Sequence, residues 1–307
     1  MRGTTIKAAV GVAVVAVAVA ATACGQDQAQ PEQHQHEKAT VVASTDVWGS
    51  VASAVAGDHA TVNSLLKSAV DDPHSFEASP ADAAAITDAS LVVYNGGGYD
   101  HWVDDVLANH PDVQAVNAYS LLNSAEQPAN EHVFYDMGTA KAVATTIADR
   151  LAQADADHAS AYRANAAEFG KQADTILESE RAIAQAHPGA AVVATEPVAH
   201  YLLVNAGITD TTPPGFSSAV EEDTDPSPAD IAAMLDLINS RQVAALLFNP
   251  QTETTATKQV EDAARQASIP VVTVTETLPE GTDYLTWQRQ TVEQVASQLD
   301  KAPQTNR

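Results

Sequence analysis

The chain of 307 residues carries 40 acidic and 15 basic side chains, which gives a formal charge of −25 at pH 7. A surface this negative repels nucleic acids and anionic lipids and attracts cations over long range, so we expect no nucleic-acid partner and no anionic substrate. The chain has one cysteine, which excludes an internal disulfide and a metal site built from several thiolates.

The first 23 residues predict a secretory signal peptide. Two basic residues, Arg2 and Lys7, precede an uncharged, Ala- and Val-rich run at 8–23 that ends in small residues. This run is shorter than the roughly 20 apolar residues that a membrane-spanning helix requires. Once the signal is removed, 13 basic residues remain against 40 acidic ones, and the formal charge becomes −27.

Cys24 follows the small residues at 21–23. This resembles the lipobox of bacterial lipoproteins, with Ala21 where Leu is more common, and it implies that acyl chains anchor the secreted protein to the outer face of the cytoplasmic membrane. The alternative is a chance cysteine in an ordinary signal peptide. Residues 24–38 are polar and Gln-rich, which predicts a flexible tether. Its His34 and His36 either collect metal loosely or are simply solvated.

After the tether, short β-branched runs alternate with Ala-rich helical stretches. This predicts an α/β fold of parallel-type sheets with helices on both faces. About 270 residues exceed what one core usually requires, so we expect two lobes. The predicted strands are 40–44, 60–65, 91–94, 115–117, 191–194, 243–248 and 270–274. The predicted helices are 47–56, 80–87, 101–108, 138–154, 159–186, 199–206, 228–240, 256–266 and 284–299.

The helix predicted at 159–186 is unusually long. It contains no proline, and Pro188-Gly189 follows its end. At about 1.5 Å per residue it spans roughly 40 Å. We interpret it as a linker helix between an N-terminal lobe, 39–158, and a C-terminal lobe, 187–307. The alternative is one more helix packed on a single sheet.

The two predicted lobes echo each other. S-A-V-D-D at 68–72 precedes S-P-A-D at 79–82, then a helix and a strand; S-A-V-E-E at 218–222 precedes S-P-A-D at 227–230 and the same two elements. In S-P-A-D the serine is a helix N-cap, the proline takes the first helical position and the aspartate lies in the first turn. The repeated order indicates lobes of similar architecture with a ligand between them.

The sequence lacks the motifs of nucleophile-elbow hydrolases, P-loop NTPases and H-E-x-x-H metalloproteases. N-G-G-G at 95–98 lacks the full dinucleotide-binding spacing and is typical of a flexible turn. His74 and His132 lie on predicted loops at the ends of elements, where α/β folds build ligand sites.

Several segments together resemble one protein family. Residues 72–82 read D-P-H-S-F-E-A-S-P-A-D, which is similar to the D-P-H-x-[YF]-E-P-x-P-x-D segment of zinc/manganese-type substrate-binding lipoproteins, the cluster A-I family of ABC importers. Residues 89–96, 131–136, 194–201 and 274–277 resemble further segments of that family, in the same order. The proline of the family's usual D-P-H-V-W-L-D is missing at 131.

Carried over position by position, the resemblance implies a metal site formed by His74, His132, Glu196 and Glu276. Two imidazoles and two carboxylates supply nitrogen and oxygen donors, and the two negative charges balance a divalent ion. Both histidines belong to the first lobe and both acids to the second, so a bound metal would hold the lobes together.

Alternatives remain for the two acids. Glu196 is also suited to a helix N-terminus, where it would face the helix dipole. Glu280 or Asp283 is an alternative to Glu276. Asn249, which follows a predicted strand, is a candidate to fix the second nitrogen of a ligating imidazole by a hydrogen bond.

The resemblance implies an extracytoplasmic solute-binding protein, not an enzyme, that captures a divalent transition metal and delivers it to the permease of an ABC importer. We expect a monomer. The carboxylate-rich donors favour Mn²⁺, and Zn²⁺ is a close second because the affinity order favours it at such donors. The alternatives are a binding protein for a siderophore or other metal chelate, and a surface adhesin or metal chaperone without a transporter.

Overall fold

Two four-stranded parallel sheets organise the chain, and their strands follow the same order. The computed structural model describes residues 38–67, 73–123 and 130–302. The predicted signal peptide 1–23, Cys24 and the tether as far as residue 37 lie outside the described residues.

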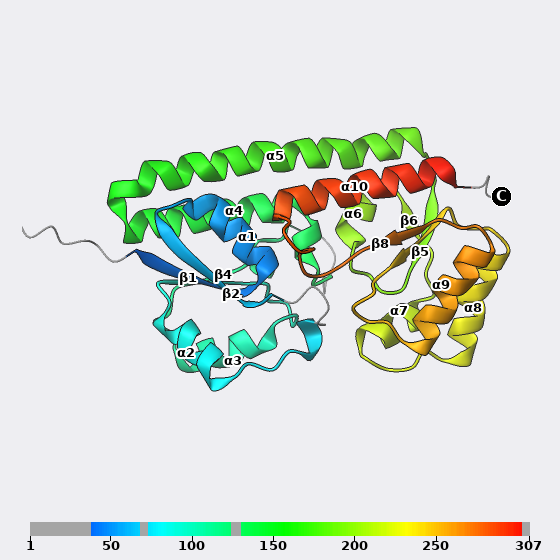
Figure 1. Ribbon diagram of the computed structural model, residues 1–307, viewed down its shortest axis with the longest axis horizontal. Helices are drawn as coiled ribbons and strands as arrows, with labels where there is room; N and C mark the ends of the chain where they lie inside the picture. Colours follow the sequence, from blue (N-terminus) through cyan, green and yellow to red (C-terminus); the bar gives the residue numbers. More distant parts are fainter. Residues whose placement is uncertain (1–37, 68–72, 124–129, 303–307) are drawn as a thin grey trace, which may run out of the picture. The chain divides into compact units, whose positions relative to one another are not determined.

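The first sheet has the strand order β2-β1-β3-β4, with every pairing parallel (Figure 1). Its strands are β1 (Ala39–Thr45), β2 (Ala60–Leu66), β3 (Leu91–Tyr94) and β4 (Ala115–Asn117). Its helices are α1 (Asp46–Ala56), α2 (Pro80–Asp88), α3 (His101–Asn109) and α4 (Met137–Ala154). These elements form the first lobe.

The second sheet has the order β6-β5-β7-β8 and is also parallel. Its strands are β5 (Ala191–Ala194), β6 (Thr209–Asp210), β7 (Ala245–Phe248) and β8 (Val271–Thr273). Its helices are α6 (His200–Asn205), α7 (Pro214–Glu221), α8 (Pro228–Asn239) and α9 (Thr255–Gln266). These elements form the second lobe.

Side chains of the central strand β1 alternate between two cores. Val41 and Ala43 belong to the core shared with α1 and α4, whereas Val42 belongs to a core with Ile86 of α2 and Trp102 of α3. Because helices cover both faces, the strand reads as a continuous apolar run. The second sheet has the same alternation.

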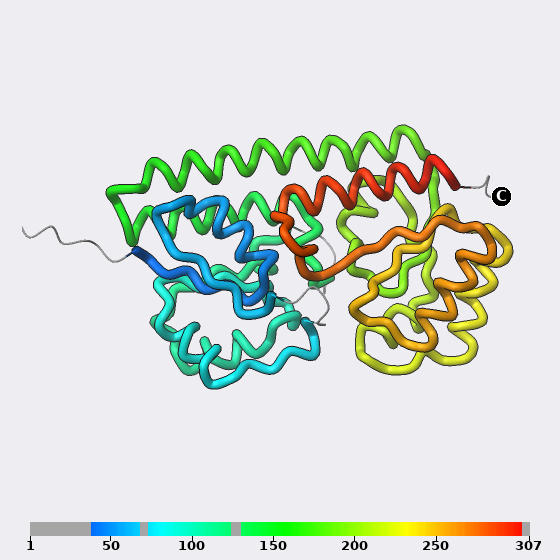
Figure 2. The backbone as a smooth tube through the Cα atoms, viewed as in Figure 1, coloured from blue at the N-terminus to red at the C-terminus, as the bar shows by residue number. Residues whose placement is uncertain are grey.

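The long helix α5 (Ala159–Ala186) extends along both lobes, and α10 (Tyr284–Lys301) lies beside it, mainly along the second lobe (Figures 1 and 2). One core cluster contains Val41 of the first sheet, Ala173 of α5 and Val192 of the second sheet. The lobes therefore share a continuous apolar core. None of the helices in the described ranges combines the length and apolar composition that crossing a membrane requires.

The predicted fold class, two α/β lobes with parallel sheets and a long linking helix, is confirmed. The predicted elements agree with the structure to within about two residues at each end. The sequence did not predict α7 or the short strand β6. Both lie in a stretch whose T-T-P-P-G sequence at 211–215 is typical of a loop, but Pro214 occupies an early helical position, which proline tolerates.

Candidate metal centre

The predicted site residues lie beyond the carboxyl ends of the parallel strands. His74 lies in the 3₁₀ turn Pro73–Ser75 after β2, and His132 lies between β4 and α4. Glu196 follows β5 and Glu276 follows β8. In parallel sheets these ends share one edge, where α/β proteins bind ligands.

Three of the four residues meet closely. Glu276 Oε2 lies 3.3 Å from His74 Nε2 and 3.4 Å from His132 Nε2. Each of the three residues offers one potential ligand atom, and these atoms lie within 4.8 Å of one another. His132 and Glu276 are fully buried, whereas the His74 side chain is 19% exposed. The structure thus joins two nitrogen donors of the first lobe to one oxygen donor of the second.

Glu196 lies at the same site but outside this tight group. Its carboxyl is buried, and its Oε1 accepts a 2.5 Å hydrogen bond from Thr252 Oγ1. Its Oε2 is buried and has no hydrogen-bond donor in the described part of the chain. Burial and then the negative charge of Glu276 raise the pKa of Glu196 to about 8, and the charge of His132 lowers it.

Charges at the centre are strongly coupled. Burial opposes ionisation of Glu276, but hydrogen bonds and charge from His132 and His74 outweigh it and hold the pKa of this carboxyl at about 2. Burial lowers the pKa of the His132 imidazole, yet the neighbouring Glu276 raises it above its ordinary value overall. A divalent cation would take the place of the protons that now balance these carboxylates.

Asn130 fixes the ring orientation of His132. Asn130 Oδ1 accepts the backbone N–H of His132 and lies 3.1 Å from His132 Nδ1. Because this oxygen is an acceptor, Nδ1 carries a proton and donates it. A neutral imidazole then has its lone pair on Nε2, the nitrogen that faces Glu276.

The loop after β7 holds the acidic residues. Asn249 Nδ2 donates to Glu276 Oε1 at 2.8 Å, so Asn249 contacts a carboxylate of the site and not an imidazole as predicted, and Asn130 takes the position beside the imidazole of His132. Glu276 N donates to Gln251 Oε1 at 2.7 Å. With the hydrogen bond from Thr252 to Glu196, one short loop contacts both carboxylates.

Glu221, at the end of α7, lies beside the site although the sequence did not predict it there. Its Oε1 lies 3.8 Å from His132 Nδ1, and Glu131, His132 and Glu221 form a second group with the spacing of metal ligands. Burial raises the pKa of Glu221 to about 7. The sequence feature that could have identified Glu221 is S-A-V-E-E at 218–222, which repeats S-A-V-D-D at 68–72 and contains this residue.

The alternative acids lie elsewhere. Asp283 is the N-cap of α10 and accepts a hydrogen bond from Thr286 N, and Glu280 is exposed. Neither belongs to a described group of potential metal ligands. Cys24, His34 and His36 lie outside the described residues.

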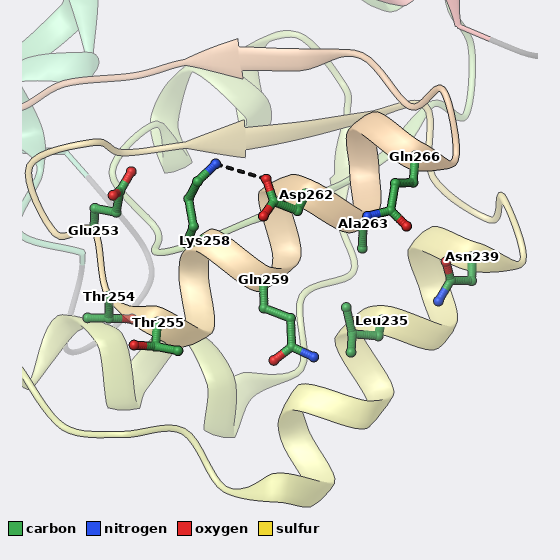
Figure 3. Close-up of a pocket in the computed structure, with 10 residues that line it drawn as sticks. All are labelled: Leu235, Asn239, Glu253, Thr254, Thr255, Lys258, Gln259, Asp262, Ala263 and Gln266. Carbon is green, nitrogen blue, oxygen red and sulfur yellow. Dashed lines mark hydrogen bonds and ion pairs between the residues drawn. The ribbon is translucent and has the colours of Figure 1, made fainter.

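A surface groove of about 1010 Å³ lies between α8 and α9 (Figure 3). Lys258 and Asp262, one turn apart on α9, form an ion pair at 2.9 Å on one wall of this groove. None of the four predicted metal ligands lines this groove. The groove is therefore separate from the metal centre, although it is large.

The chain is similar to known metal-binding proteins. The manganese-binding lipoprotein MntA of Bacillus subtilis is 24% identical over 249 residues, which cover 75% of this chain and 77% of that protein. The MntA of Halalkalibacterium halodurans is 26% identical over 162 residues, and the chain spans about half, 54%, of its length.

Solved structures share the fold. The periplasmic zinc-binding protein TroA of Treponema pallidum superposes with a TM-score of 0.73 at 16% identity, covering 86% of this chain and 99% of TroA. The laminin-binding protein Lmb of Streptococcus agalactiae, described as bifunctional with adhesin and metal-transporting activity, gives 0.72 at 24% identity, covering 86% and 100%. The family model described as "Zinc-uptake complex component A periplasmic" matches residues 41–298. The resemblance noted in the sequence is thus confirmed, and the chain belongs to this family of metal-uptake binding proteins.

Proposed function

We propose that the protein captures a divalent transition metal between its lobes and delivers it to the permease of an ABC importer. The proposed ligands are His74, His132, Glu196 and Glu276. One observation carries the proposal: buried ligand atoms of His132, Glu196 and Glu276 lie at one place in the molecule. In the described ranges, His132 Nε2 and Glu276 Oε2 have no hydrogen-bond partner beyond the imidazole–carboxylate group itself, and Glu196 Oε2 has none. Buried polar atoms are normally paired, so this arrangement is suited to a cation.

The donor set supports Mn²⁺ as cargo, with Zn²⁺ a close second. Two carboxylates beside two imidazoles form a harder donor set than a histidine-rich site, and carboxylate oxygens suit Mn²⁺. The named MntA relatives are manganese-binding, and the family description names zinc uptake. Zinc stays in competition because divalent-metal affinity at most sites rises from manganese to zinc.

The small size of the centre favours a bare ion over a metal chelate. The ligand atoms of His74, His132 and Glu276 lie within 4.8 Å of one another, and two of the three residues are fully buried. A siderophore would need an open cleft between these groups. The same closeness supports a binding protein that is not an enzyme, because ligands on all sides leave little room for a substrate and an activated water.

Residues 39–158 and 187–307 form the two metal-binding lobes in this proposal, and 159–186 links them. We further propose that Cys24 carries the acyl chains that keep the mature, monomeric protein at the outer face of the membrane. In the bacterial host, Cys24→Ser should move the protein from the membrane fraction to the soluble extracytoplasmic fraction. Unchanged membrane association of this variant would contradict the anchor.

Metal content tests the site directly. We expect elemental analysis of protein purified from its native host to find one equivalent of Mn²⁺ or Zn²⁺. His74→Ala and Glu196→Ala should lose most of it, because each removes a donor. His110→Ala is the matched control, since this histidine caps the end of α3 in the first lobe, away from the centre. Equal metal content in all four proteins would show that the proposed site is wrong.

A further inference from the structure

The loop Asn249–Thr252 between β7 and α9 donates one side-chain hydrogen bond to each carboxylate of the site, Glu276 and Glu196. Asn249 Nδ2 donates to Oε1 of Glu276 at 2.8 Å, and Thr252 Oγ1 donates to Oε1 of Glu196 at 2.5 Å. Both donors are buried, Asn249 completely and Thr252 with 8% exposed. Each carboxylate therefore has one oxygen engaged by the same loop.

The second oxygen of each carboxylate stays available. Glu276 Oε2 faces the two imidazole nitrogens at 3.3 and 3.4 Å. Glu196 Oε2 is buried without a hydrogen-bond donor in the described ranges. In both carboxylates, Oε1 accepts a hydrogen bond from the loop and Oε2 is available to bind a metal ion.

The loop itself is fixed in place. Asn249 N donates to Thr195 Oγ1 at 3.1 Å, which ties the end of β7 to the residue before Glu196. Gln251 accepts from Glu276 N and donates from Nε2 to Thr277 Oγ1 at 3.0 Å. A donor anchored on both sides cannot easily follow a carboxylate that rotates, so the orientation of both carboxylates is restricted.

We propose that Asn249 and Thr252 are specificity-determining positioning residues, which limit Glu276 and Glu196 to one ligand oxygen each. This inference rests on the proposed function and on the same ligands. With two nitrogens and two oxygens, the site offers four donors. Zn²⁺ accepts four donors readily, whereas harder ions such as Mn²⁺ gain more from additional oxygens. The restriction therefore keeps Zn²⁺ in competition at a donor set whose carboxylates suit Mn²⁺. Releasing either Oε1 would allow two-oxygen binding and would shift selectivity toward Mn²⁺.

The test measures coordination as well as affinity. Metal-free mature protein is titrated with Co²⁺, whose visible absorption is much stronger in four-coordinate sites than in six-coordinate ones, and with Zn²⁺ and Mn²⁺ in competition. We expect a strong Co²⁺ spectrum from the wild type. Thr252→Val and Asn249→Ala should weaken that spectrum and lower the Zn²⁺ affinity by about 10- to 100-fold, the usual effect of losing such a contact. The Mn²⁺ affinity should fall less, so the Zn²⁺/Mn²⁺ affinity ratio should move toward Mn²⁺.

Two further variants separate positioning from general damage. Thr252→Ser keeps the hydroxyl and should restore the wild-type spectrum and ratio. Thr291→Val removes another buried threonine hydroxyl, which donates to Trp287 O within α10, and should change neither. A purely structural role for Thr252 would change thermal stability and leave the Co²⁺ spectrum alone.

The possible failures can be told apart. A wild type that binds none of the three metals would contradict the proposed function. A wild type that binds Co²⁺ with a weak, six-coordinate spectrum would overturn only the proposal that the loop restricts the carboxylates. This wild-type measurement tests the proposal even if a variant fails to fold. Unchanged spectra and ratios in folded Thr252→Val and Asn249→Ala would overturn it as well.

Discussion

At the scale of single residues, Glu180 is the side chain least expected from the sequence. It lies on α5, is fully buried, and neither carboxyl oxygen has a hydrogen bond of good geometry in the described part of the chain. Burial raises its pKa to about 8; the nearby Asn205 amide and Arg181 oppose the shift, and the negative charge of Asp136 adds to it. Tyr284 of α10 lies close enough for Glu180 to raise the pKa of its phenol.

Because the pKa of Glu180 is raised in the folded state, we expect the free energy of unfolding to fall as pH rises. Below the unfolded-state pKa of about 4.5, the Glu180 carboxyl is protonated in both the folded and the unfolded chain, so its titration does not change the free energy of unfolding. Between there and about 8 only the unfolded chain releases the proton, so the folded state loses up to about 5 kcal/mol before the effect levels off. Urea unfolding of metal-free protein at pH 5.5 and 8 should show a smaller pH-dependent loss for Glu180→Gln than for the wild type. Equal losses would contradict this assignment.

At the scale of elements, the helix starts follow from the local sequence. Ser79 Oγ accepts from Asp82 N at the start of α2, and Ser227 Oγ accepts from Asp230 N at the start of α8, with proline in the first turn of each helix. These contacts involve neighbours in sequence, so the S-P-A-D motif alone is sufficient to predict both.

Removing either cap should cost a similar free energy. We expect Ser79→Ala and Ser227→Ala each to lower the free energy of unfolding by about 1 kcal/mol, because a first-turn N–H loses its acceptor. Ser179→Ala is the control: its hydroxyl donates to Thr175 O inside α5, a bond that adds little to helix stability. Chemical denaturation measures all three. A cap variant no weaker than Ser179→Ala would contradict the cap energies.

At the scale of the whole molecule, hydrogen bonds between the lobes surround the centre. Tyr135 of the first lobe donates to Thr275 O at 2.9 Å, and Tyr201 of the second donates to Asn130 O at 2.6 Å. Leu278 N donates to Asp46 Oδ1 at 3.2 Å. Together with the core along α5 and α10, these contacts should make the lobes unfold as one cooperative unit.

Cooperative unfolding makes bound metal a global stabiliser. At a free metal concentration of 100 times Kd, a ligand that binds only the folded state adds about 2.7 kcal/mol. We expect one denaturation transition, shifted upward by metal in the wild type and not in His132→Ala. Separate transitions for the two lobes, with metal moving only one, would contradict a shared core.

Local signals in the sequence determine much of the fold. Strand and helix periodicity, the Pro-Gly pair after 159–186 and the S-P-A-D caps depend on neighbours in the chain, and they locate most elements to within about two residues. The missed helix α7 shows the limit: its proline-rich start is typical of a loop, and burial of Phe216 and Val220 against the second sheet stabilises the helix.

For the site, too, local sequence signals determine one part and tertiary packing determines the rest. The sequence by itself determined which residues are candidate ligands, because imidazoles and carboxylates on loops at strand ends form recognisable motifs. Only the tertiary structure decided that His74, His132 and Glu276 meet within 4.8 Å, that Glu221 joins His132, and that one loop holds both carboxylates. These contacts link residues 27 to 202 positions apart, and packing of the sheets and of α5 brings them together, which no local pattern encodes.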